Sequence, residues 1–236
     1  MLKQKMNIQH IPAILWGEQS NHLVIAVHGN KSNKEDNNIA VFAECVLPKG
    51  YQVLSFDLPN HGERTGENIP LKAQNAAQDL KNIMRYAMKA AKNISVFACS
   101  IGAYFSLLAY NEMPLRQALF LSPVVDMERM ICNMMTWFNV SEDRLKTEQE
   151  IATPIGQPLY WDYFRYVKEH PITKWNVPTT ILYGSKDDIV DKDTVDKFAK
   201  RFHADLQVME QGEHYFHTDE QLSFFRQWCE SSIKAI

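Results

Sequence analysis

The sequence predicts an α/β fold in which helices cover both faces of a mostly parallel sheet. Short apolar runs rich in β-branched residues recur along the chain and have the length of buried strands. Longer segments of helical period separate these runs, and this alternation is typical of parallel sheets. The 236 residues, of which 45% are hydrophobic, can bury one sizeable core but are too few for two ordinary enzyme domains. We therefore expect a single domain over residues 1–236.

Six apolar runs give the clearest strands. They occupy residues 23–27, 51–56, 94–98, 118–121, 179–183 and 206–209. Helices are predicted where apolar residues recur three and four positions apart. These helices cover residues 73–91, 103–110 and 194–202, and a last one follows Thr218. Thr218 and Gln221 have the spacing of a capping box, which marks the start of that last helix.

The stretch over about 126–175 fits the alternation poorly, and we interpret it as an inserted helical cap. It combines clustered methionines and aromatic residues with a polar middle and with Pro154 and Pro158. Six apolar residues in it follow near-helical spacing: Met127, Met130, Ile131, Met134, Met135 and Phe138. Such a stripe is most often plain core. The alternative is an apolar wall for an acyl group, because thioether side chains adapt to varied ligands.

Composition argues against several classes of partner. The net charge is −3, and the 25 basic residues are spread along the chain, so we expect no binding of nucleic acid. The apolar runs are far shorter than the roughly 20 residues of a membrane span. Lys3 and Lys5 precede polar residues instead of an apolar signal segment, which favours a cytoplasmic protein. The four cysteines lie far apart without metal-ligand spacing, so we expect reduced thiols and neither a disulfide framework nor a metal site.

Ser100 is the strongest candidate for a nucleophile. It stands where a predicted strand gives way to a predicted helix. A nucleophile on such a turn has a strained backbone, so the residues two before and two after it must be small. Ala98 and Gly102 meet this requirement. Cys99 as nucleophile would have two bulky residues at those positions and is therefore disfavoured.

Two backbone N–H groups are candidates for stabilising a negatively charged oxygen. The motif Val-His-Gly-Asn ends at Asn30, just after the first predicted strand, where a loop can donate such a group. The second donor would be the N–H of Ile101, which directly follows the candidate nucleophile at a helix N-terminus. The alternative is that His28 and Gly29 only turn the chain.

Candidate partners for Ser100 follow two later strands. Asp187 and Asp188 come just after the strand at 179–183, at the sheet edge where ligands of open α/β sheets bind. His214 follows the last strand, in a loop from which an imidazole can reach both a nucleophile and an acid. A solvated Asp-Asp turn and a structural histidine are the alternatives. The sequential order Ser, Asp, His, each after its own strand, favours a catalytic triad.

With these motifs the chain resembles the α/β-hydrolase family over nearly its full length, in particular the small bacterial esterases and monoacylglycerol-lipase-like members. Residues 56–64, Phe-Asp-Leu-Pro-Asn-His-Gly-Glu-Arg, add a segment similar to that family's Asp-x-x-Gly-His-Gly loop, whose role is structural. The chain departs from the family pattern at Ala98 and Asn60, where glycine is commoner. Neither departure removes a reacting group.

The resemblance implies a triad of Ser100, His214 and Asp187 with oxyanion donors at Asn30 and Ile101. The resemblance places Asp187 in register with the family's acid, in preference to Asp188. It likewise places His214 in register with the family's base, in preference to His217. The α/β-hydrolase dehalogenases and epoxide hydrolases need a carboxylate nucleophile in place of Ser100, so the resemblance does not extend to their chemistry.

The implied activity is hydrolysis of a carboxylic ester with a small or medium acyl group, through an acyl-enzyme and without a cofactor. A small-molecule ester is the expected partner, and the sequence leaves the oligomeric state open. A thioesterase, an amide hydrolase or a carbon–carbon bond hydrolase could use the same triad. A non-catalytic module that keeps the pocket for ligand binding is an alternative of another class.

Overall fold

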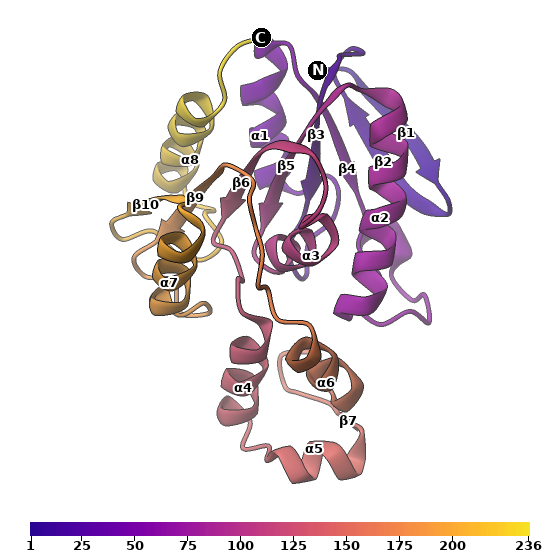
Figure 1. Ribbon diagram of the computed structural model, residues 1–236, viewed down its shortest axis with the longest axis vertical. Helices are drawn as coiled ribbons and strands as arrows, with labels where there is room; N and C mark the ends of the chain where they lie inside the picture. Colours follow the sequence, from indigo (N-terminus) through magenta and orange to yellow (C-terminus); the bar gives the residue numbers. More distant parts are fainter.

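An eight-stranded sheet forms the centre of the protein, in the order β1-β2-β4-β3-β5-β6-β9-β10 (Figure 1). The computed structural model describes residues 1–236. The six strands from β4 to β10 in this order are parallel, whereas β2 runs antiparallel to both its neighbours. The strands are β1 (Lys3–Ile8), β2 (Ile11–Trp16), β3 (His22–Val27), β4 (Gln52–Phe56), β5 (Asn93–Cys99), β6 (Leu115–Leu121), β9 (Thr179–Gly184) and β10 (Asp205–Met209). All six predicted strands are present.

The sequence patterns did not predict the hairpin of β1 and β2. The turn between these strands places Gln9 and His10 at φ 50° and 70°, a conformation that hairpins usually assign to Asn-Gly or Gly. Strand β1 is mostly exposed, so it lacks the apolar run of a buried strand. Pro12 inside β2 is also unfavourable for a strand.

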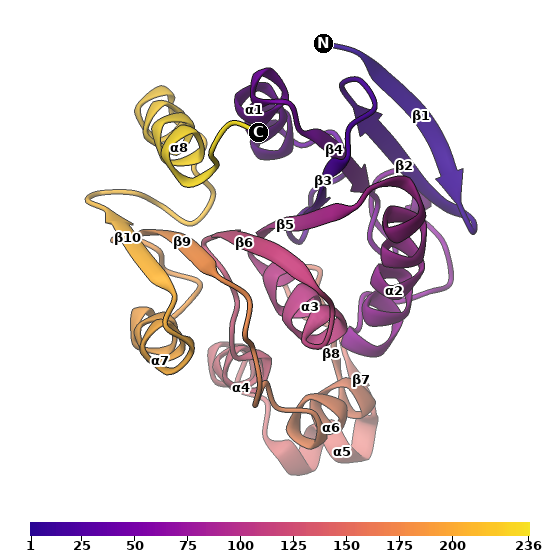
Figure 2. The ribbon, with the colours of Figure 1, turned by 45° about the horizontal axis from the view of Figure 1, so that its top comes forward.

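Helices cover both faces of the sheet (Figure 2). On one face lie α2 (Ala73–Ala90), α3 (Ile101–Tyr110) and α7 (Lys192–Phe202), and on the other α1 (Asn37–Val46) and α8 (Asp219–Ser232). Two short 3₁₀ helices, η1 (Leu47–Lys49) and η2 (Gly62–Arg64), complete the connections. The alternation along β3 matches the two layers, since Leu23, Ile25 and Val27 belong to the first core and Val24 and Ala26 to the second.

The four predicted helices are present, and α1 is a helix that the sequence patterns missed. Helix α1 is apolar at most positions after Asn38, so helical periodicity does not mark it. The capping box of α8 is formed in part. Thr218 Oγ1 accepts from the Gln221 N–H at 3.3 Å, but Gln221 Oε1 accepts from the His217 N–H, one residue earlier than the motif requires.

Between β6 and β9 the chain leaves the sheet and forms a separate helical segment, here called the insertion (Figure 1). It contains α4 (Met127–Trp137), α5 (Glu142–Glu148), β7 (Glu150–Ile151), β8 (Leu159–Tyr160) and α6 (Trp161–Glu169). Helix α4 packs on α6, and α6 packs on α2. None of the helices is long and apolar enough to cross a membrane.

Candidate active site

Ser100 lies on the sharp turn between β5 and α3, with φ 51° and ψ −121°. A serine at positive φ is strained, and backbone hydrogen bonds hold it there. Its N–H donates to Leu121 O at 3.0 Å, and its carbonyl accepts from the Ala103 and Val124 N–H groups. A Cβ on Gly102 would lie 2.6 Å from the His28 carbonyl oxygen. The loop after β3 therefore leaves room only for glycine at position 102.

A chain of hydrogen bonds joins Ser100 to His214 and Asp187. His214 Nε2 lies 2.9 Å from Ser100 Oγ, and His214 Nδ1 lies 2.7 Å from Asp187 Oδ2. The other carboxylate oxygen, Asp187 Oδ1, accepts from the N–H groups of Ile189 and Val190 at 3.0 and 2.9 Å. A carboxylate beside Nδ1 assigns the ring proton to that nitrogen and leaves Nε2 free to accept from the serine hydroxyl.

The sequence offered two neighbouring candidates, Asp188 and His217. Neither takes part in the hydrogen bonds that join Ser100, His214 and Asp187. The side chain of Asp187 is fully buried, whereas Asp188 is exposed at the rim of the site. His217 is exposed and pairs with Glu213 at 3.4 Å. All four cysteines are free, and no group of three or more His, Cys, Asp and Glu residues could hold a metal ion.

The loop after β3 brings Asn30 close to Ser100. A Cβ on Gly29 would lie 3.2 Å from Ser100 Cβ, so this glycine sets the close approach. Neither the N–H of Asn30 nor that of Ile101 donates to a turn, loop or cap acceptor. Both groups are therefore free to donate to a bound oxygen.

His28 does more than turn the chain. Its Nδ1–H donates to Gly29 O at 2.7 Å, and its Nε2 accepts from the Leu58 N–H at 3.0 Å. The ring thus ties the loop after β3 to the loop after β4. Burial lowers the pKa of His28 from 6.5 to about 4, so the ring is neutral when it makes these two bonds.

A buried ion pair fixes the same two loops. Lys34 Nζ lies 2.6 Å from Asp57 Oδ2, and the side chains of both residues are almost fully buried. The N–H groups of Lys34 and Glu63 also donate to the Asp57 carboxylate. Position 62 has φ 55°, and a Cβ there would lie 2.2 Å from Asp57 Oδ1, so only glycine fits. Sequence reasoning missed Lys34, although an aspartate that ends a buried strand requires a cationic or hydrogen-bonding partner.

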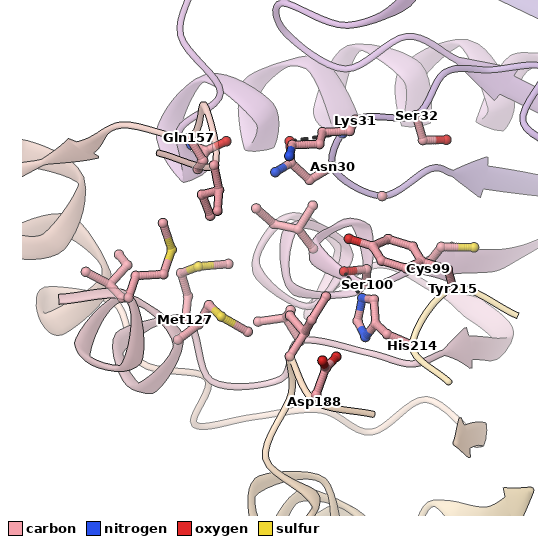
Figure 3. Close-up of a pocket in the computed structure, with 18 of the residues that line it drawn as sticks. Asn30, Lys31, Ser32, Cys99, Ser100, Met127, Gln157, Asp188, His214 and Tyr215 are labelled. Carbon is pink, nitrogen blue, oxygen red and sulfur yellow. Dashed lines mark hydrogen bonds between the residues drawn. The ribbon is translucent and has the colours of Figure 1, made fainter. Parts of the chain in front are cut away.

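A cavity of about 390 Å³ lies beside Ser100, between the sheet and the insertion (Figure 3). Its apolar wall comes mainly from Met127, Met130, Ile131 and Met134 of α4 and from Leu159. Figure 3 shows Ser100 and His214 at one end of the cavity and Met127 toward the other. Met135, which the sequence placed in the same stripe, is buried outside the cavity.

Tyr215 also borders the cavity, and sequence reasoning missed it. Its ring packs edge-on against the His214 imidazole, with 5.0 Å between centroids. Its position directly after the candidate base was the available signal, but that position alone does not identify a lining residue, because Glu213 on the other side of His214 does not line the cavity.

No family model and no curated protein matches the chain. Solved structures match its fold over almost the whole length. Est1E from Butyrivibrio proteoclasticus, with ferulic acid bound, has a TM-score of 0.79 at 18% identity and covers 97% of both chains. Mouse alpha/beta hydrolase domain-containing protein 10 has a TM-score of 0.78 at 15% identity and covers 98% of both chains. An esterase from Pyrococcus furiosus has a TM-score of 0.69 at 19% identity and covers 98% of this chain and 87% of that one. The chain has the α/β-hydrolase fold.

Proposed function

We propose that the protein is a serine hydrolase that cleaves carboxylic esters through an acyl-enzyme. The observation that carries this proposal is the hydrogen-bonded chain from Ser100 through His214 to Asp187, with Ser100 on a strained turn at the edge of a cavity. The similar folds described as esterases favour an ester over other acyl compounds as substrate.

In the first half of the reaction, His214 Nε2 takes the proton of Ser100 as Oγ attacks the ester carbonyl. Asp187 accepts a hydrogen bond from His214 Nδ1–H and stabilises the imidazolium that forms. The N–H groups of Asn30 and Ile101 donate hydrogen bonds to the carbonyl oxygen and stabilise the negative charge that develops on it. His214 then protonates the departing alcohol, and the acyl group stays on Ser100.

In the second half, His214 accepts a proton from a water that attacks the acyl-enzyme carbonyl. The same two N–H groups stabilise the second oxyanion. Collapse of the intermediate releases the carboxylic acid and returns the proton to Ser100.

The apolar wall of α4 suits the acyl part of the substrate. Each buried methylene contributes up to about 0.8 kcal/mol, and methionine side chains adjust to ligands of different shape. A cavity of about 390 Å³ fits a short or medium acyl chain better than a long one.

Ser100→Ala tests this proposal with p-nitrophenyl butyrate as substrate. We expect kcat to fall by a factor on the order of 10⁴ or more, because nucleophile and base act as a unit. Cys99→Ala is the matched control, since it also removes a polar side-chain atom beside the turn, and should keep most of the activity. Comparable turnover by Ser100→Ala and the parent would refute the assignment, and absence of ester turnover in folded parent protein would favour a binding module.

A comparison of butyryl esters, thioesters and amides decides among the acyl substrates. We expect kcat/KM to be highest for the ester. A higher value for the thioester or the amide would move the activity to that class without changing the triad.

A further inference from the structure

A second cavity, of about 600 Å³, adjoins the one that contains Ser100. We call it the polar cavity and the first the catalytic cavity. They share six lining residues: Asn30, Lys31, Ser32, Gln157, Pro158 and Tyr160. The rest of the polar cavity is lined by the loop at 60–72 and by Glu150 and Gly156. A ligand whose reacting carbon lies at Ser100 can therefore extend into the polar cavity past Asn30.

The polar cavity has neutral hydrogen-bonding groups that no protein group satisfies. Ser32 Oγ is buried and has no hydrogen-bond partner, which is costly unless a ligand or water provides one. Two side-chain amides that line the same cavity, the partly buried one of Gln157 and the exposed one of Asn68, also make no hydrogen bond within the protein. These three residues come from three separate segments: the loop after β3, the loop after η2 and the insertion.

The charges around the polar cavity largely cancel. Lys72 pairs with Asp162 at 2.7 Å, and Glu67 pairs with Arg64 at 2.8 Å. Of the remaining charged side chains, Lys31 and Glu150 have opposite sign and no ion-pair partner. The cavity therefore favours a neutral ligand over an anion or a cation.

We propose that the polar cavity binds a sugar as the alcohol part of the ester. This inference rests on the proposed ester hydrolysis. Hydroxyl groups both donate and accept, as do the free groups of Ser32, Asn68 and Gln157. The volume exceeds what a methyl or ethyl alcohol fills. The acyl group then occupies the apolar wall of the catalytic cavity.

The order of the reaction agrees with this division. The alcohol leaves after the first half, while the acyl group remains covalently attached to Ser100. The polar cavity is bordered by exposed residues between Gly62 and Ile69, so a hydrophilic alcohol can depart to solvent. The acyl chain meanwhile stays in contact with α4.

Three octanoyl-length compounds test the proposal: 6-O-octanoyl-glucose, methyl octanoate and the reversed ester octyl gluconate. For the parent we expect kcat/KM to be about tenfold or more higher for the glucose ester than for the methyl ester, because several hydrogen bonds form to the sugar. Ser32→Ala, Asn68→Ala and Gln157→Ala should each lower that ratio about three- to tenfold. The control Gln78→Ala, on the exposed face of α2, should keep the parental ratio.

The outcomes separate the two proposals. Hydrolysis of the methyl ester without preference for the glucose ester, and with ratios that none of the three variants changes, overturns the sugar proposal and leaves ester hydrolysis intact. Preference for octyl gluconate also overturns it, because the sugar-like part would then be the acyl group. If folded parent protein hydrolyses none of the compounds, ester hydrolysis itself is overturned.

Discussion

Asp187 and Asp188 are adjacent in sequence, but their surroundings differ. The side chain of Asp187 is buried and accepts from His214 and from two backbone N–H groups, while Asp188 is exposed at the cavity rim. Asp187→Asn should lower kcat about 10³- to 10⁴-fold, because an amide in its place no longer fixes the imidazole tautomer. Asp188→Asn should keep kcat within about tenfold of the parent, since it removes no hydrogen bond to His214. Steady-state kinetics with one p-nitrophenyl ester measure both, and the opposite ranking would reassign the acid.

Because the pKa of His28 is lowered in the folded protein, this residue makes the free energy of unfolding decrease as the pH falls. Its pKa is about 4 in the folded protein and 6.5 in the unfolded chain, so between these values the unfolded state binds more protons. Its contribution to stability is therefore complete above pH 6.5 and is lost as the pH falls toward 4. From pH 7 to pH 4.5 the free energy of unfolding should fall by about 2 kcal/mol more in the parent than in His28→Gln.

Urea unfolding at several pH values checks this difference, and the variant corrects for carboxylates that titrate in the same range. An equal fall in parent and variant would mean that His28 is not held neutral by burial. The prediction concerns stability alone and is independent of the proposed reaction.

Helix α4 places two neighbouring methionines in different surroundings. Met134 lines the catalytic cavity, while Met135 is buried outside it, and both are less than a tenth exposed. Met134→Ser should shift the chain-length preference toward shorter acyl groups, because a hydroxyl replaces part of the apolar wall. Met135→Ser is the matched control, since it removes the same side chain from a comparably buried position, and should keep the parental profile.

A series of p-nitrophenyl esters from acetate to palmitate measures the profile as kcat/KM for the parent and both folded variants. The acyl-wall interpretation fails if kcat/KM for the parent falls steadily from acetate onward. It also fails if Met134→Ser and Met135→Ser have the same profile as the parent.

The elements that sequence patterns predict are those in which the spacing of apolar residues reflects how the element is buried. The six parallel strands and α2, α3, α7 and α8 have such patterns. The β1–β2 hairpin has an exposed first strand and an unusual turn at Gln9 and His10, and α1 is apolar on nearly every side. Local sequence does not distinguish these two from other structures.

At the scale of the whole molecule, the parallel topology gathers the candidate site. Strands β3, β5, β9 and β10 end at one edge of the sheet, and Asn30, Ser100, Asp187 and His214 follow those ends. The positions of these residues could be predicted because each lies one to five residues after the end of a strand. Lys34 and the polar cavity could not, because they depend on how the loop after β3, the loop after β4 and the insertion pack against one another.

Covalent labelling with a fluorophosphonate is the sharpest test of whether Ser100 is an activated nucleophile. Such a probe requires an activated serine and not only a pocket. We predict one label per chain, on the peptide that contains Ser100, with strong loss of labelling in Ser100→Ala and His214→Ala and parental labelling in Cys99→Ala. Absence of labelling in folded parent protein, or a label on any other residue, would mean that Ser100 is not the activated nucleophile.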